Sequence, residues 1–445
     1  MYWRLKTKTS RYIWLTATGY VFYGWWNAKF CLLMLFSTLV SYIAGRAILS
    51  ANTQIQKKRA MLIAVVIDLT LLGFFKYYNF FIDSVAAVFS AAGAPIPITH
   101  LNIILPVGIS FYTFHTMSYV IDAYRGVIKP TKNFFEFSCY VSLFSQLVAG
   151  PIVRFRQIED DLENIDKSNQ FAKIEEGISI FLIGLSKKVL IADSIATIID
   201  PAFKNAGLMG TEGSWLLALG YTYQLYFDFS GYSDMAVGLG LMFGIRIPQN
   251  FNSPYKAVSI SDFWRRWHIS LSTWLRDYLY IPLGGNRRGE VRTHVNLLIT
   301  MLLGGLWHGA NWTFIVWGAF HGVLLTINNL FKNHVSIQLP KFIGQFITFL
   351  CVVIGWVYFR SEILGHANAV IDKMFSMQSG LLPQPVGSLV GFIFIAGLIA
   401  HIAPNTMELK HRWRPAMAYV FAGLFLLCMF RIIANENSPF LYFQF

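Results

Sequence analysis

Long apolar runs recur along the whole chain of 445 residues, and they restrict its possible folds more than any other feature. A helix that crosses a bilayer needs roughly 20 consecutive apolar residues, because the hydrocarbon layer is about 30 Å thick. The longest polar stretch between such runs is Arg154 to Lys173. With 55% hydrophobic and 13% charged residues, the chain has too much apolar surface for a water-soluble core. The sequence predicts a single all-α membrane domain over residues 1–445.

Apolar composition indicates eleven candidate membrane segments, and some are too long for one straight span. In residues 214–245, Asp228 and Asp234 flank the pair Ser230-Gly231, which is a turn signal between two carboxylates. We therefore expect a break between two helices there. The segments are 12–26, 29–50, 60–81, 101–124, 134–151, 174–203, 214–245, 293–330, 341–359, 384–402 and 415–434.

The net charge of +13 does not indicate nucleic-acid binding, because the basic residues form short clusters between apolar runs. Clusters such as Lys57-Lys58-Arg59 favour the cytoplasmic side of a membrane and anionic lipid headgroups. The four cysteines lie inside apolar stretches without the spacing of metal ligands. Membrane lipid is thus an expected partner, and neither nucleic acid nor a bound metal is expected.

Segment 259–281 has the pattern of an amphipathic helix rather than of a membrane span. Ser259 and Asp262 fit a helix N-cap, and tryptophans and leucines recur on one face at helical spacing. His268 falls on this aromatic face, away from the arginines. The spacing is also typical of an interfacial aromatic belt, so on the residues alone a role for His268 in chemistry stays open.

Two histidines are the only ionisable residues between Asn296 and Leu330, namely His308 and His321. Ionisable residues inside membrane segments are costly and tend to mark functional sites. Glycines around His308 allow a helix or a substrate chain to approach closely, although they also fit a plain packing motif. No comparable feature surrounds His321, for which a neutral ring bonded to a carbonyl is an equal explanation.

A histidine in an apolar site is disfavoured in its charged form, so the ring of His308 is expected to be neutral and able to accept a proton. Such a ring fits a general base that acts on a hydroxyl group. If two full spans join at Gly309 to Trp312, His308 lies near a membrane surface. A broken or re-entrant helix places it at mid-membrane, and the residues alone leave both arrangements open.

Five motifs occur in one order over about a hundred residues, and together they resemble the membrane-bound O-acyltransferase family, in particular its bacterial branch of alginate O-acetyltransferase-like proteins. Shorter matches extend the likeness over nearly the full chain. The five motifs are Tyr226-Phe-Asp228-Phe-Ser-Gly231-Tyr-Ser-Asp234, Asn250-Phe-Asn252-Ser-Pro254-Tyr255, Phe263-Trp-Arg265-Arg266-Trp-His268-Ile-Ser-Leu-Ser272-Thr-Trp-Leu-Arg276-Asp277-Tyr278, Leu283-Gly-Gly-Asn286-Arg287 and Gly304-Gly-Leu-Trp307-His308-Gly309-Ala-Asn311-Trp312.

The resemblance implies a ring of about 11 or more membrane helices around a funnel, with re-entrant segments and a catalytic core at about residues 220–325. In this family pattern His308 and His268 match the two catalytic histidines. Substrate-binding roles are expected for Arg265, Arg266, Arg276, Asp277, Trp307 and Asn311. For the charged residues, ion pairs that order the segment and contacts with lipid headgroups remain alternatives.

The resemblance also implies a function. An acyl group, expected to be acetyl, is taken from a cytoplasmic thioester donor, either acetyl-CoA or a carrier-linked thioester, and no cofactor stays bound. The implied acceptor is a periplasmic SGNH-type partner, which then acetylates a polysaccharide such as alginate or peptidoglycan. The implied location is the bacterial cytoplasmic (inner) membrane, with multiple spans.

A transporter or channel is the alternative function, with intramembrane His and Asp residues along a solute path. It predicts internal repeats and opposed half-helices. The sequence shows no repeat at a fixed period.

Overall fold

The structure is a computed structural model that describes residues 1–167, 173–335, 339–411 and 415–434. In these residues the chain forms helices and no strand apart from one isolated bridge, between Met209 and Leu381. The chain divides into two compact units. The first comprises Met1–Ile174 and Leu239–Pro248, and the second Glu175–Gly238 and Gln249–Phe445.

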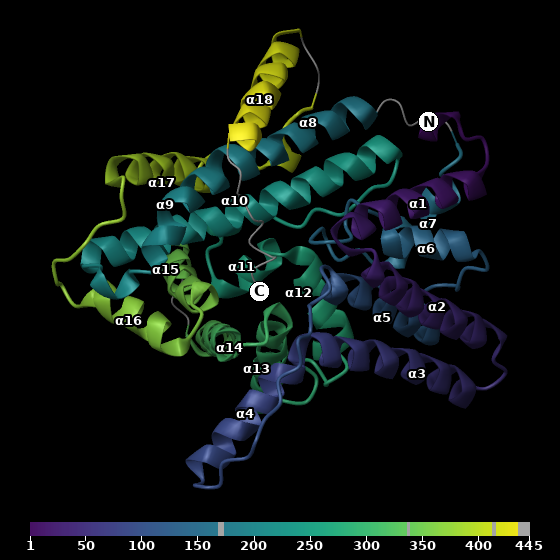
Figure 1. Cartoon of the computed structure of the whole chain (residues 1–445), viewed down its shortest axis with the longest axis horizontal. Coiled ribbons are helices and arrows are strands. Elements are labelled where there is room, and N and C mark those ends of the chain that lie inside the picture. The colour runs from purple at the N-terminus through teal and green to yellow at the C-terminus, as the bar shows by residue number, and fades with distance from the viewer. Residues whose placement is uncertain (168–172, 336–338, 412–414, 435–445) are drawn as a thin grey trace. The chain divides into compact units, whose positions relative to one another are not determined.

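The first unit is built around α5, whose side chains are nearly all buried. Helices α2 and α3 pack on α5 and on each other, and Figure 1 shows α2, α3 and α5 side by side. A buried carboxylate joins the three, because Asp68 of α3 accepts hydrogen bonds from Ser37 of α2 (2.7 Å) and Thr116 of α5 (2.8 Å). The elements are α1 (Lys8–Asn27), α2 (Lys29–Ser50), α3 (Gln54–Leu72), the π-helix η2 (Gly73–Tyr77), α4 (Tyr78–Ala91), α5 (Ile109–Arg125), α6 (Phe134–Ser142) and α7 (Phe155–Glu163).

The second unit contains the segments that carry the sequence motifs. Its helices begin with α8 (Ile174–Ser186), η4 (Lys187–Ala192), α9 (Asp193–Phe203), η5 (Ala206–Leu208), α10 (Thr211–Phe243), η6 (Pro254–Lys256), α11 (Ile260–Arg266), α12 (Ile269–Leu275) and η7 (Arg276–Tyr280). They continue with α13 (Glu290–His308), α14 (Trp312–His334), α15 (Lys341–Arg360), α16 (Leu364–Phe375), α17 (Val386–His401), η8 (Thr406–Glu408) and α18 (Pro415–Ala434).

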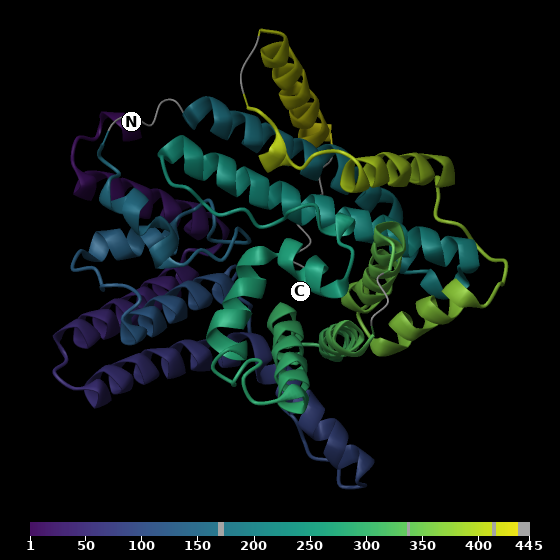
Figure 2. The same cartoon turned by 180° about the vertical axis from the view of Figure 1, so that it is seen from behind.

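The predicted break in segment 214–245 is wrong, because α10 is one continuous helix of 33 residues. Gly231 serves close helix packing instead of a turn: a Cβ atom there would lie 2.6 Å from the carbonyl oxygen of Gly184 in α8. Figures 1 and 2 both show α8 and α10 running side by side. The two carboxylates are tolerated because Lys188 pairs with Asp228 (2.7 Å) and Lys187 with Asp234 (2.6 Å).

The single amphipathic helix predicted over 259–281 is also wrong in part. The predicted cap is confirmed, since the side chain of Ser259 accepts a hydrogen bond from the backbone N–H of Asp262. The helix then stops at Arg266, and α12 begins only at Ile269. His268 between them has a left-handed backbone with φ 42° and ψ 54°, which interrupts helical hydrogen bonding.

Five helices in the described residues are long and apolar enough to cross a membrane, so the expected count of 11 or more is not confirmed. Several predicted segments are shorter than a span: the helix in 134–151 covers only Phe134–Ser142, and the helix in 101–124 begins at Ile109. The five candidates are Lys29–Ser50, Gln54–Ala91, Trp312–His334, Lys341–Arg360 and Pro415–Ala434.

Candidate active site

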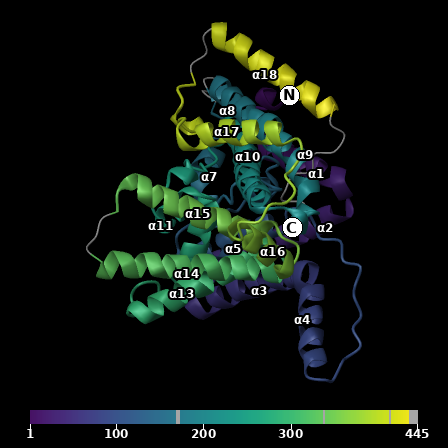
Figure 3. The same cartoon turned by 90° about the vertical axis from the view of Figure 1, so that its left-hand side faces the viewer.

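The helical hairpin of α13 and α14 carries His308 at its end. Helix α13 is unbroken and ends at His308, and α14 begins at Trp312, so only three residues connect them. The helices pack backbone to backbone, because a Cβ atom on Gly305 would lie 2.2 Å from the carbonyl oxygen of Phe314. Figure 3 shows α13 and α14 lying side by side. The predicted small-residue packing motif therefore holds together the same hairpin that carries His308 at its end.

His308 is buried at this end of the hairpin, with 5% of its surface exposed. Its ring lies against the rings of Trp307, Trp317 and Phe359, with centroid distances of 5.0, 5.1 and 5.1 Å. Phe359 comes from α15, so three helices build the aromatic enclosure. Such surroundings disfavour the imidazolium form and favour a neutral ring.

His268 meets His308 in the same enclosure, although 39 residues separate them in the sequence. Their ring centroids are 6.4 Å apart, and Trp307 lies 6.1 Å from His268. His268 is fully buried (0% exposed), with its ring edge-on to Phe229 of α10 at 4.7 Å. The structure thus brings together the two histidines that the sequence motifs single out.

The remaining predicted site residues differ in their contacts, and several of them form ion pairs. Arg266 pairs with Asp262 at 3.0 Å, and Arg276 pairs with the adjacent Asp277 at 2.7 Å. The hydrogen bond from the guanidinium group to the Asp277 carboxylate raises the pKa of Arg276. These contacts match the alternative in which the charges order the segment.

Arg265 differs from its neighbours because its guanidinium group has no ion-pair partner in the described part of the chain. It is exposed and lines a cavity of about 810 Å³ together with Lys332 of α14. The rest of the lining is part apolar, from Leu297, Leu325, Phe331 and Val335, and part amide and hydroxyl, and no carboxylate of the described residues contributes to it. The polar lining comprises Ser259, Ser261, Tyr280, Asn286, Asn328 and Asn329.

Trp307 and Asn311 flank His308 in different ways. Trp307 is buried and contacts both histidine rings. Asn311 caps α14, since its Oδ1 accepts from the Thr313 N–H (3.0 Å), and its Nδ2 donates to the carbonyl oxygen of Glu362 (2.7 Å). The side chain of Asn311 therefore shapes the turn after His308.

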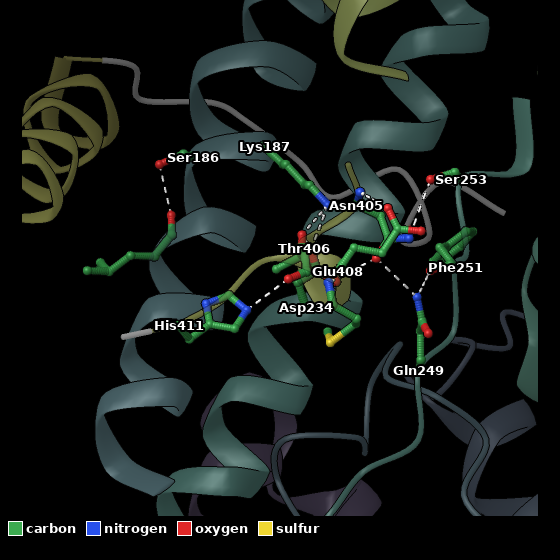
Figure 4. Close-up of polar contacts among 12 residues, drawn as sticks. Ser186, Lys187, Asp234, Gln249, Phe251, Ser253, Asn405, Thr406, Glu408 and His411 are labelled. Carbon is green, nitrogen blue, oxygen red and sulfur yellow. Dashed lines mark hydrogen bonds and ion pairs between the residues drawn. The ribbon is translucent and has the colours of Figure 1, made fainter. Parts of the chain in front are cut away.

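A second buried polar cluster lies around Asp234 (Figure 4). Its carboxylate accepts from Lys187 Nζ and from the Thr406 hydroxyl, both at 2.6 Å, and Lys187 also donates to Thr406 at 2.8 Å. The next residue, Lys188, joins Asp228 to Asp193 at 2.7 and 2.6 Å. Sequence reasoning did not identify the two lysines, although a Lys-Lys pair inside the apolar segment 174–203 was a signal.

Sequence reasoning also assigned no role to Asn250, whose Oδ1 lies 3.2 Å from His268 Nδ1. It stands in one of the five motifs, but nothing in its spacing showed which side chain it contacts. His321, left open by the sequence, is buried among the rings of Trp264, Trp317 and Phe263. Among the described residues no ring contact joins His321 to His268 or His308, although His321 and His308 both contact Trp317.

Known proteins resemble this chain over most of its length. Residues 12–365 match the membrane-bound O-acyltransferase family. A probable alginate O-acetylase of Azotobacter vinelandii is 42% identical over 99% of this chain and 96% of its own length. A peptidoglycan O-acetyltransferase of Helicobacter pylori is 38% identical over 82% of this chain and 74% of its own length.

A more distant relative is a teichoic acid D-alanyltransferase of Bacillus subtilis, 30% identical over 60% of this chain and 71% of its own length. These matches favour acyl transfer over the transporter or channel alternative. Together with the apolar helices, they indicate a multi-pass membrane protein. The chain belongs to the membrane-bound O-acyltransferase family, and it is an acyltransferase.

Proposed function

We propose that this protein transfers an acetyl group from a cytoplasmic thioester to an acceptor hydroxyl, for O-acetylation of an extracytoplasmic polysaccharide. The observation that carries the proposal is the pair of buried histidines, with His268 and His308 6.4 Å apart inside one aromatic enclosure. The relatives named for alginate and peptidoglycan O-acetylation support the polysaccharide class.

His308 acts as the general base in this proposal. Its neutral ring accepts the proton of the acceptor hydroxyl while the oxygen attacks the thioester carbonyl. The carbon–sulfur bond then breaks, and the proton passes from the ring to the leaving thiolate. The products are an O-acetyl ester and a free thiol, and the ring returns to its neutral form. His268 is close enough to share a hydrogen-bonded hydroxyl group or water with His308.

The donor is acetyl-CoA or a carrier-linked thioester, and both carry phosphate. Arg265 and Lys332 line one cavity without any carboxylate in its wall, which suits an anionic group. The amides of Asn286 and Asn328 add neutral polar groups. We place the phosphate end of the donor at this cavity, so that Arg265 acts in substrate binding.

The acceptor side is proposed from the family resemblance of the sequence motifs, and only the polysaccharide class has support from the names of the relatives. A periplasmic SGNH-type partner would receive the acetyl group and pass it to alginate, to a similar exopolysaccharide or to peptidoglycan. This division of labour requires the bacterial inner membrane, where a cytoplasmic thioester and a periplasmic hydroxyl are on opposite sides. Transfer of D-alanine is less supported, since that relative is 30% identical and covers 60% of this chain.

The test compares polymer O-acetylation in cells with wild type and His308→Ala at matched membrane abundance. Loss of a general base predicts a decrease of about a hundredfold to ten-thousandfold. His321→Ala is the matched control, because it removes a buried histidine from the same hairpin without touching His268. Undiminished acetylation by His308→Ala, or equal loss in both variants, overturns the catalytic role of His308.

A further inference from the structure

One buried amide, that of Asn250, holds His268 in place. Asn250 is 2% exposed and lies in the connection between α10 and η6. Its backbone carbonyl accepts from the Ile269 N–H at 2.9 Å. Its side-chain Oδ1 lies 3.1 Å from the Ser270 N–H nitrogen and 3.2 Å from His268 Nδ1. Main chain and side chain of one residue thus fix residues 268–270.

The orientation of the Asn250 amide follows from its partners. A backbone N–H can only donate, so the side-chain atom facing the Ser270 nitrogen must be the oxygen. The amide nitrogen then points to the Ser233 hydroxyl of α10, at 3.2 Å. A flipped amide would set two donors against each other at Ser270.

This orientation decides which nitrogen of His268 carries the proton. An amide oxygen is only an acceptor, so Nδ1 facing it at 3.2 Å must be the N–H of a neutral ring. The Ser270 hydroxyl is the one alternative donor to Nδ1, but it is 3.4 Å from Nδ1 and 2.9 Å from Asn250 Oδ1. If Nδ1 had the lone pair, it would face the lone pairs of Oδ1.

The other ring nitrogen, Nε2, is buried and has no hydrogen-bond partner in the described part of the chain. Buried polar atoms are normally satisfied, so one left open inside an active site indicates a position for substrate. The backbone conformation of His268 also indicates a functional position. His268 holds a left-handed conformation (φ 42°), which surrounding contacts must maintain against its local preference.

The loop that carries Asn250 is bonded to Asn405, as Figure 4 shows for Gln249 and Ser253. The Gln249 amide donates to the carbonyl oxygen of Phe251 at 2.6 Å. Asn405, beside the Asp234 cluster, donates to Asn252 Oδ1 at 3.0 Å. None of these bonds involves the Asn250 side chain itself, which is held toward His268 by its own contacts with the Ser270 N–H and the Ser233 hydroxyl.

We propose that Asn250 is a positioning residue that holds His268 as the Nδ1–H tautomer, with the lone pair of Nε2 open inside the site beside His308. The proposal rests on the proposed function, in which His268 acts beside His308. In serine proteases, a wrong tautomer of the catalytic histidine costs about ten-thousandfold in rate, which shows how much such a contact can matter.

Two isosteric variants separate this role from packing. Asn250→Leu removes the acceptor and is expected to lower acetyl transfer about a hundredfold. Asn250→Asp keeps an acceptor oxygen, so it retains more activity, and its carboxylate stabilises the imidazolium form of His268. The ring of His268 is then neutral only at higher pH, so the acidic limb of the pH–rate profile should shift to higher pH by about one pH unit. His308 is the one titratable side chain in ring contact with His268 among the described residues.

The matched control is Asn252→Ala, which changes the same loop and loses its bond to Asn405 without touching His268. Its transfer rate is expected within about twofold of wild type, as for most changes outside a site. Equal losses in Asn252→Ala and Asn250→Leu, or an unshifted pH profile in Asn250→Asp, overturn the positioning role.

A readout without activity tests the tautomer itself. Nitrogen NMR of ¹⁵N-histidine-labelled wild-type protein, assigned by difference from His268→Gln, is expected to show a protonated Nδ1 and an unprotonated Nε2. In Asn250→Leu the two tautomers should both be populated.

A protonated Nε2 in wild type overturns this inference and leaves the acyl-transfer proposal intact. Full acetylation by His308→Ala overturns that proposal and leaves the tautomer assignment unaffected. If the Asn250 variants fail to accumulate, the wild-type spectrum still decides.

Discussion

The second unit contains two buried polar clusters with opposite character. Around Asp234 and Asp228, every carboxylate faces a lysine, and the Thr406 hydroxyl completes the contacts. Around His268, the ring nitrogen Nε2 has no hydrogen-bond partner among the described residues and lies inside an aromatic enclosure. A cluster in which every polar group has a partner stabilises the fold, whereas a buried polar group without a partner can still form a hydrogen bond with a substrate. The clusters should therefore respond differently to substitution.

The largest effect is expected from removing both histidines of the site. His268→Ala and His308→Ala should each lower transfer by about a hundredfold to ten-thousandfold. The double variant should be no worse than the more affected single variant, because residues that act as a unit are not additive. Acetyl transfer per folded molecule is the measurement, with the thermal unfolding midpoint as control. Losses that multiply in the double variant would show that the two rings act independently.

Breaking the satisfied cluster should have the opposite signature. Lys187→Met leaves the Asp234 carboxylate buried without its cation, a change that costs about 3–5 kcal/mol of stability. The unfolding midpoint in detergent should fall while transfer per folded molecule stays near wild type. The double variant Lys187→Met/Asp234→Leu should recover part of the loss. Normal stability with lost transfer would show that Lys187 takes part in transfer, and it would contradict the proposed difference between the two clusters.

Close packing of the hairpin links the site to the fold. A Cβ atom on Gly305 would lie 2.2 Å from the Phe314 carbonyl oxygen, so Gly305→Ala must separate α13 from α14 and costs about 1–3 kcal/mol. Because His308 is at the end of the same hairpin, transfer should fall as well. Gly391→Ala in α17 is the control, since nothing lies within 4 Å of its added methyl group. Equal unfolding midpoints for the two variants would contradict the packing role of Gly305.

Sequence reasoning predicted the helical class and the Ser259 cap, because each depends on local spacing, and its motifs single out two histidines that the structure brings within 6.4 Å, whose catalytic role stays a prediction. It failed where contacts distant in sequence decide the backbone. The helix through His268 is interrupted because Ile269 bonds to the Asn250 carbonyl group, and no period in residues 259–281 reveals that partner. The break expected at Gly231 is absent because α8 packs against it. The sequence shows Asn250 only as one residue of a motif and does not reveal its contact with His268.

The smallest effect is expected at the cavity, where two adjacent arginines provide a sharp comparison. Arg265 lines the cavity without an ion-pair partner in the described residues, whereas Arg266 is paired with Asp262. Arg265→Gln removes a cation available to the donor phosphate, so the apparent KM for the thioester should rise about tenfold, in line with a charge-assisted hydrogen bond of about 1.5 kcal/mol. The maximal rate should change little, because the cavity takes no part in proton transfer.

Arg266→Gln has the same change in charge and serves as the control. It loses a partly exposed ion pair worth about 0.2–1 kcal/mol, so stability falls slightly and the KM stays near wild type. Initial rates over a range of donor concentrations in membrane vesicles separate the two parameters. If both variants raise the KM equally, the effect comes from general surface charge and not from the cavity. If neither does, the donor phosphate binds elsewhere, and the unpaired guanidinium group of Arg265 faces lipid headgroups instead.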